Sequence, residues 1–124
     1  MKDESRSVVD LKTRTRDFAL RIIRLYGALP QRMEAWVLGK QLLRSGTSVG
    51  AHYREGMRSR SDAEFISKLE GALQELEETA YWLELLGEAD LVPSARLTDL
   101  RQETDELTAI LTTCVKKPKA KLPP

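Results

Sequence analysis

The chain has 124 residues, the usual size of one compact domain, which excludes an enzyme with separate cofactor and substrate domains. Its 20 Lys+Arg and 19 Asp+Glu almost cancel, so the net charge of +1 by itself predicts neither a nucleic-acid nor a membrane partner. A single cysteine, Cys114, excludes an internal disulfide and a thiolate metal cluster. The sequence shows no apolar leader and no uncharged run of the roughly 18 residues that a membrane helix needs, so we expect a cytoplasmic protein.

Apolar residues recur at helical intervals in four segments. In the first, from about Val9 to Leu29, steps of four and three residues place one mostly apolar stripe on a helix. The second runs from about Met33 to Arg58 and contains a run of small residues between positions 45 and 51. Because each glycine costs a helix about 1 kcal/mol relative to alanine, this run indicates that another helix approaches closely there.

The remaining two helices lie in the second half of the chain. Ser61 and Glu64 have the spacing of a capping box and open the third helix, which continues to Gly87. Pro93 is placed for the first turn of the fourth, which we expect to end near Val115. The sequence therefore predicts an all-α protein in which residues 1–115 form an antiparallel up-down four-helix bundle. Residues 116–124 are basic and proline-rich, which predicts a mobile tail.

The near-zero net charge hides a segregation of charge along the chain. Residues 1–60 carry 13 Lys+Arg and 6 Asp+Glu, a net +7, whereas residues 61–124 carry 7 and 13, a net −6. The guanidinium group of arginine binds phosphate oxygens through two parallel hydrogen bonds. The basic half, residues 1–60, therefore predicts a surface that binds a polyanion. The candidate nucleic-acid-binding residues, with two from the tail, are Arg14, Arg16, Arg21, Arg24, Arg54, Arg58, Arg60, Lys116 and Lys117. The alternative is that the arginines pair with acids of the third helix, namely Glu70, Glu75, Glu77, Glu78 and Glu84.

A turn near Arg60 would set the register between the second and third helices. Residues whose numbers add to about 120 would then face each other, which predicts an ion pair between Arg44 and the nearby Glu75 and Glu78. Breaking a partly buried pair from one side costs about 3 kcal/mol or more, so the sequence predicts that Arg44→Ala destabilises the protein more than Arg14→Ala.

No residue pattern points to catalysis. His52 is the only histidine, which excludes a two-histidine metal site and leaves a hydrogen-bonding role in the core or an interface. Cys114 lies on an apolar stripe, as expected of a small buried side chain rather than a nucleophile. Glu77 and Glu78 are adjacent on a helix and point apart, so they do not form an acid and base pair. We expect no enzymatic activity, no metal and no cofactor.

Trp36 and Trp82 are large aromatics for so small a chain. In a helical bundle they fill the core or a seam between subunits, which we favour over stacking on bases. The chain has no aromatic sheet for RNA recognition and no zinc-finger spacing. Any nucleic-acid binding is therefore expected to use the backbone and its shape.

The middle of the chain, residues 41–87, contains two motifs. The motif of the second helix comprises Arg44, Ser45, Gly46, Thr47, Ser48, Val49, Tyr53 and Glu55. The motif of the third helix comprises Ser61, Phe65, Ile66, Lys68, Leu69, Glu75, Glu78, Thr79, Tyr81, Trp82 and Leu83. Through these residues the chain resembles the bacterial four-helix bundle proteins encoded in 23S rRNA intervening sequences, also called S23 ribosomal proteins. His52 departs from the asparagine that is usual in the family. As structural motif residues we single out Arg44, Ser48, His52, Glu55, Glu75 and Glu78.

The resemblance implies a ring-like homopentamer that binds structured RNA or DNA and brings no catalytic residues. A related bundle is the accessory protein of diversity-generating retroelements, which binds nucleic acid and a reverse transcriptase. The small residues and polar motif of the second helix are features that a subunit interface could use. Two functions stay open: a module that binds nucleic-acid backbone, and a scaffold whose ring docks another protein such as a reverse transcriptase. Only binding to nucleic-acid backbone is expected to weaken steeply as the salt concentration rises.

Overall fold

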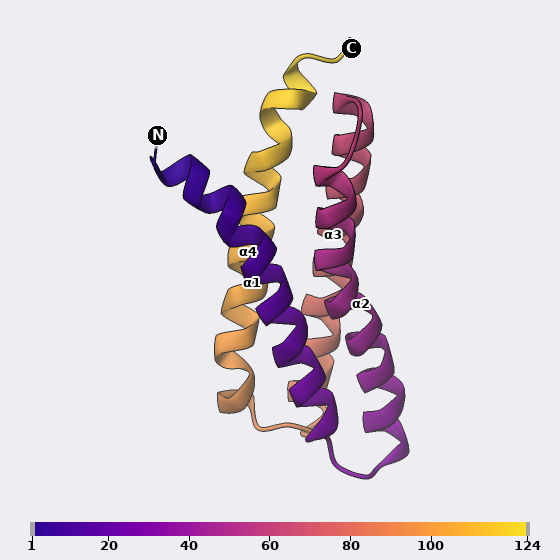
Figure 1. Cartoon of the computed structure of the whole chain (residues 1–124). Helices are drawn as coiled ribbons and strands as arrows, with labels where there is room; N and C mark the ends of the chain where they lie inside the picture. Colours follow the sequence, from indigo (N-terminus) through magenta and orange to yellow (C-terminus); the bar gives the residue numbers. More distant parts are fainter. Residues whose placement is uncertain (1, 124) are drawn as a thin grey trace.

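The computed structural model describes residues 2–123 and the side chains of residues 11–123. Over these residues the chain forms four helices, α1 (Lys2–Gly27), α2 (Met33–Met57), α3 (Asp62–Glu88) and α4 (Ser94–Ala120). Consecutive helices run in opposite directions, so the ends of the described chain lie at the end of the bundle that carries the α2–α3 turn (Figure 1). The four-helix, all-α architecture predicted from the sequence is confirmed.

The helices differ in how extensively they pack against one another. α2 and α3 form the most extensive pair, α1 packs against α2, and α4 packs against α3. α1 and α4 touch only slightly, and α1 leans away from the bundle toward its N-terminus (Figure 1). None of the helices in residues 2–123 is long and apolar enough to cross a membrane.

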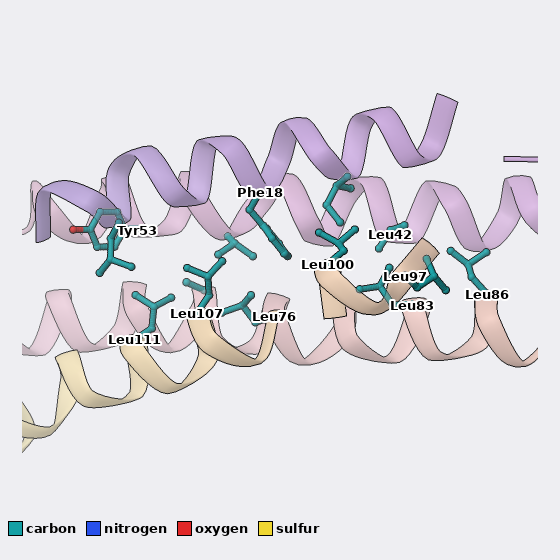
Figure 2. Packing of buried hydrophobic residues seen from close by; sticks show 14 of the residues in the cluster. Phe18, Leu42, Tyr53, Leu76, Leu83, Leu86, Leu97, Leu100, Leu107 and Leu111 are labelled. Carbon is teal, nitrogen blue, oxygen red and sulfur yellow. The ribbon is translucent and has the colours of Figure 1, made fainter. Parts of the chain in front are cut away.

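The core is filled by side chains from all four helices (Figure 2). The side chains of this cluster are at most 6% exposed, and burying each large aliphatic or aromatic member contributes about 1.5–3 kcal/mol. Thr15 of α1 and Thr104 of α4 are polar residues on the buried faces of their helices. Their hydroxyls are satisfied there because each donates to the backbone carbonyl four residues earlier, both at 2.7 Å. Representative core residues are Phe18, Leu42, Tyr53, Leu76, Leu83, Leu107 and Leu111.

The predicted start of the third helix is confirmed at its cap. Ser61 is the N-cap residue of α3, and its side-chain oxygen accepts a hydrogen bond from the Glu64 backbone N–H at 3.1 Å. Pro93 is the N-cap residue of α4 rather than part of its first turn, because the helix begins at Ser94.

Two helix ends differ from the sequence prediction. α4 continues past Val115 to Ala120, so the predicted end of the fourth helix is wrong and residues 116–120 are helical. Pro118 removes one backbone hydrogen bond, but the Lys119 ammonium pairs with Glu70 of α3 at 2.5 Å and holds this last turn against the bundle. α1 likewise begins at Lys2 instead of near Val9. Apolar periodicity marks only the buried part of a helix and does not report a polar extension. Residues 1 and 124 lie outside the described part of the chain.

Candidate nucleic-acid interface

The small residues of α2 let its neighbours approach closely within one chain. A Cβ added at Gly46 would lie 2.7 Å from Ile22 Cγ1 of α1, and Gly50 is buried under α1 in the same way. On the other side, the fully buried Ser45 hydroxyl shares a 2.8 Å hydrogen bond with the Thr79 hydroxyl of α3. The predicted close approach is confirmed. These three positions are buried inside the chain, so they do not form the exposed subunit surface that the sequence suggested for them.

The predicted ion pair between the second and third helices is confirmed. The Arg44 guanidinium lies 3.2 Å from Glu75 Oε1, and its second amino group hydrogen-bonds to Glu78. The hydrogen bond to Glu78, together with the negative charges of Glu75 and Glu78, raises the pKa of Arg44. The Arg44 side chain is 51% exposed, so water screens this pair more than the sequence argument assumed.

His52 extends the polar motif along the α2–α3 seam. Its Nδ1 lies 3.4 Å from Glu55 Oε1 and its Nε2 lies 3.7 Å from Glu75 Oε2. Lys68 of α3 reaches Glu55 at 3.5 Å, and the His52 ring lies against Gly71, where a Cβ would be 3.2 Å from Nδ1. With a side chain 33% exposed, His52 sits in the seam between two helices rather than in the core.

Ser48 completes the motif by donating its hydroxyl to the Arg44 backbone carbonyl at 2.6 Å. Arg44, His52 and Glu55 therefore link α2 to Glu75, Glu78 and Lys68 of α3, whereas the Ser48 hydroxyl bonds within α2. This arrangement supports a structural role for them.

Five of the candidate nucleic-acid-binding residues share one end of the bundle. Arg54 lies in the last turn of α2, and Arg58 and Arg60 belong to the α2–α3 turn that follows. Lys116 and Lys117 lie near the end of α4, which reaches the same end of the molecule (Figure 1). All five side chains are exposed, and none forms an ion pair within residues 11–123. We call these five residues the basic end.

The candidates on α1 do not gather in one place. The guanidinium of Arg14 binds Glu103 of α4 through two hydrogen bonds of 3.1 and 2.6 Å and also reaches Glu106 at 3.2 Å. Arg16 is exposed and lies 3.5 Å from Asp17. Arg21 is half-buried and Arg24 is exposed, and both belong to the second half of α1, away from the basic end.

The alternative of arginine–acid pairing therefore holds for some residues only. Arg44 pairs with an acid of α3, as this alternative expected. Arg14 pairs with an acid of α4 instead, and Arg54 forms no ion pair among the described side chains. The side chains of Arg14 and Glu103 are 24% and 17% exposed, less than the 51% of Arg44. The geometry therefore reverses the order of destabilisation expected from the sequence, because Arg14 is the better buried of the two.

Neither tryptophan fills the centre of the bundle. Trp36 is 53% exposed, so of the two places expected for it the core is wrong, and the seam between subunits stays a prediction. Trp82 is partly buried against the core, and its ring lies 5.1 Å from that of Tyr81 in a tilted arrangement. The placement of Cys114 is as expected: it is partly buried against the core, and burial raises the pKa of its thiol. Within the described residues, no group of His, Cys, Asp and Glu side chains could hold a metal ion.

Comparison with known proteins supports the resemblance seen in the sequence. The family model described as 23S rRNA-intervening sequence protein matches residues 9–113. No curated protein matches the sequence. A crystal structure of a protein with unknown function from the S23 ribosomal protein family of Bacteroides thetaiotaomicron is similar, with a TM-score of 0.83 and 37% sequence identity. The match covers 89% of this chain and 98% of that chain. The chain thus belongs to the 23S rRNA-intervening sequence protein family.

Proposed function

We propose that this protein is a non-enzymatic, oligomeric helical bundle that binds the phosphate backbone of RNA or DNA through the basic end. The observation that carries this proposal is the set of five exposed cations at one end of the bundle that form no ion pair with any side chain of residues 11–123. Guanidinium groups bind phosphate oxygens in a forked geometry, and each neutralised phosphate releases counterions from the nucleic acid.

Part of this positive charge has a second explanation. Cations in the last turn of a helix interact favourably with its C-terminal carbonyls, and Arg54 and Lys117 lie in such turns. Arg58 is the C-cap residue of α2, and Arg60 lies beyond it in the turn. Because helix stabilisation fades beyond the last turn, the charge of Arg60 in particular supports a role toward a ligand.

Structured RNA is the first ligand to test. The family description connects its members with intervening sequences of 23S rRNA. The proposed unit is a ring of five copies in a homopentamer, which would present the basic end five times. Several weak sites in one assembly engage a long polyanion together and raise its apparent affinity.

Anisotropy of a labelled RNA hairpin and a labelled DNA duplex, measured from about 50 to 200 mM salt, tests the proposal. The variant Arg54→Gln/Arg58→Gln/Arg60→Gln should bind more weakly and show a shallower dependence on salt, by about 0.9 per lost contact in a log–log plot for duplex DNA. The matched control is Arg96→Gln/Arg101→Gln, which removes exposed arginines near the opposite end of α4. Absence of binding by the wild type at about 50 mM salt, or equal losses in both variants, would contradict the proposal.

The second candidate function is a scaffold that docks another protein. The large apolar side chains exposed on α1 and α2 favour it, because such surfaces are typical of protein–protein contacts. Binding of a protein partner that persists at high salt, in a protein that shows no affinity for nucleic acid, would support the scaffold.

A further inference from the structure

A surface hollow lies at the α2–α3 turn, beside the cations of the basic end. It is lined by side chains and backbone between Gly56, near the end of α2, and Phe65, in the first turns of α3. Its volume is about 350 Å³, near the lower end of the roughly 300–1,000 Å³ that sites for small ligands occupy. This size suits one nucleobase rather than a large cofactor. We call it the turn hollow.

Hydrogen bonds within the turn hold the walls of the turn hollow in place. The Ser59 hydroxyl donates to the Gly56 backbone carbonyl at 2.6 Å, and the Ser61 hydroxyl accepts from the Glu64 backbone N–H at 3.1 Å. A Cβ added at Gly56 would lie 2.5 Å from Leu69 Cδ1, so the two helices are in close contact at this turn. A ligand would therefore meet a preformed site, which reduces the cost of ordering on binding.

The lining combines an apolar wall with two charges of opposite sign. Met57 is 49% exposed and Phe65 packs partly against the core, and together they provide the apolar wall. Arg60 adds a guanidinium group and Asp62 adds a carboxylate. Both charged side chains are exposed, and neither forms an ion pair with a side chain of residues 11–123. The turn hollow thus offers one ligand an apolar surface, a hydrogen-bond donor and a hydrogen-bond acceptor.

We propose that the turn hollow binds one unpaired guanine base of an RNA whose phosphates contact the basic end. Unpaired bases of RNA loops leave the stack, pack against aromatic side chains and form hydrogen bonds through their Watson–Crick edges. In a duplex that edge is occupied by pairing, so the turn hollow selects loops and bulges. This inference rests on the proposed function and names the part of the nucleic acid that the basic end distinguishes.

The Asp62 carboxylate decides which base fits. An ionised carboxylate accepts hydrogen bonds and donates none. The Watson–Crick edge of guanine carries two neighbouring donors, N1–H and the N2 amino group, and the two carboxylate oxygens can accept both. On adenine, cytosine and uracil, an acceptor atom lies beside the donor on the same edge and would face the negative charge. Guanine is therefore the base that matches Asp62.

Arg60 connects the base site to the basic end, because it belongs to both. Its guanidinium group can bind the phosphate of the same nucleotide whose base occupies the turn hollow. A carboxylate in a site for phosphate alone would weaken binding through repulsion between like charges. The combination of Arg60 and Asp62 therefore favours a whole nucleotide over the backbone alone.

Anisotropy of three labelled RNA hairpins at one salt concentration tests the inference. The hairpins share one stem and a loop of uridines, and their central loop nucleotide is guanosine, inosine or an abasic site. Inosine lacks the N2 amino group and so loses one hydrogen bond to the carboxylate. The wild type should bind the guanosine hairpin about tenfold more tightly than the inosine hairpin, as expected for one hydrogen bond to a charged group. The abasic hairpin should bind no more tightly than the inosine hairpin.

Asp62→Asn isolates the contribution of the carboxylate. In this variant the preference for guanosine over inosine should fall from about tenfold toward no preference. Glu64→Gln is the matched control, because it removes the same charge from the same first turn of α3 at a position outside the lining. Loss of a negative charge near the basic end strengthens binding to every hairpin in both variants, so this effect cancels in the ratio. The control should keep the preference of the wild type.

The outcomes separate this inference from the proposed function. Equal binding of the guanosine and inosine hairpins by the wild type would overturn the inference, as would an unchanged preference in Asp62→Asn or an equal loss of preference in Glu64→Gln. If the three arginine substitutions at positions 54, 58 and 60 then still weaken binding to every hairpin, the basic end binds phosphate without a base site and the proposed function stands. A wild type that binds none of the hairpins contradicts both.

Discussion

The Ser45–Thr79 pair shows how single polar residues are accommodated at the centre of this bundle. Both side chains are fully buried, and their hydroxyls lie 2.8 Å apart. The Thr79 hydroxyl also lies 2.8 Å from the Glu75 backbone carbonyl, so it can donate to the backbone while accepting from Ser45. The pair therefore links α2 to α3 without leaving a buried polar group unsatisfied.

Replacing Thr79 with valine tests this link. Valine keeps the shape but removes the hydroxyl, so Ser45 loses its acceptor on α3, and we expect a loss of about 1–2 kcal/mol in the free energy of unfolding by urea. Thr112→Val is the matched control, because the Thr112 hydroxyl bonds its own helix backbone at an exposed position, and its effect should stay within about 0.5 kcal/mol. Equal effects of the two substitutions would show that the link between the helices contributes nothing.

Cys114 and Tyr53 predict how stability responds to alkaline pH. Burial raises the pKa of the Cys114 thiol, and burial followed by the nearby Cys114 raises the pKa of Tyr53. The folded state then holds these protons more tightly than the unfolded state. Their contribution to stability is complete below the unfolded pKa values and is lost as pH rises through the folded ones. We expect the free energy of unfolding to begin to fall as pH rises past about 9, the unfolded pKa of a thiol, and to fall less in Cys114→Ala. A parallel pH dependence in that variant would exclude a contribution from the thiol.

Ion pairs differ in how far the sequence can predict them. The Arg44 pair follows from a short turn that sets the register of two consecutive helices. The Arg14–Glu103 pair joins residues 89 positions apart on α1 and α4, which no single turn aligns. Its formation depends on how α1 crosses α4, and that angle is decided by packing of the whole core.

At the scale of the helices, the contact between α1 and α2 depends on a missing side chain at Gly46. An alanine Cβ there would lie 2.7 and 2.9 Å from two carbons of the fully buried Ile22. Gly46→Ala gains about 1 kcal/mol of helix propensity, but we expect a net loss of about 1–3 kcal/mol because Ile22 has no room to move. Gly27→Ala is the control, since no atom lies within 4 Å of the added Cβ, and it should be neutral or stabilising. If urea unfolding gave both variants the same midpoint, close approach would not constrain this position.

The α1–α4 contact gives a second prediction for helix packing. These helices touch only slightly, so the bidentate Arg14–Glu103 pair is a main connection between them. We expect Arg14→Ala to lower the free energy of unfolding by about 1.5–3 kcal/mol, the range for hydrogen bonds to charged groups. Arg44→Ala should cost less than about 1 kcal/mol, as is usual for an exposed pair. Urea denaturation of both variants measures the order, and a larger effect of Arg44→Ala would restore the order expected from the sequence.

Helix number and direction follow from apolar periodicity and short turns, whereas the fate of exposed apolar residues does not. Met33, Trp36 and Val37 belong to an apolar pattern in the sequence, yet each is more than half exposed. Periodicity counts apolar residues on a helix, but it does not report how wide a stripe the neighbouring helices cover. The sequence also left open whether Arg54 pairs with an acid of the third helix, and among the side chains of residues 11–123 neither Arg54 nor Arg58 forms an ion pair.

At the scale of the whole molecule, the charge segregation along the sequence becomes a separation in space. The five cations of the basic end gather at the end of the bundle that carries the α2–α3 turn (Figure 1). The exposed glutamates Glu77, Glu84 and Glu88 lie in the second half of α3, toward the opposite end. The proposed binding of nucleic acid at the basic end therefore draws on residues that lie away from these glutamates.

The proposed connection between self-association and nucleic-acid binding predicts a dependence on ligand length. If several basic ends act together, a long structured RNA should lose about 10²-fold or more in apparent affinity when the assembly is split into single chains. A short duplex that reaches only one chain should bind equally well before and after. Any variant that light scattering shows to have the mass of one chain makes this comparison, provided that its substitutions lie outside the basic end. Anisotropy titrations with both ligands at one salt concentration measure the two ratios. Equal losses on the long and the short ligand would mean that the substitutions disturb the basic end, and no loss on the long RNA would mean that each chain binds independently.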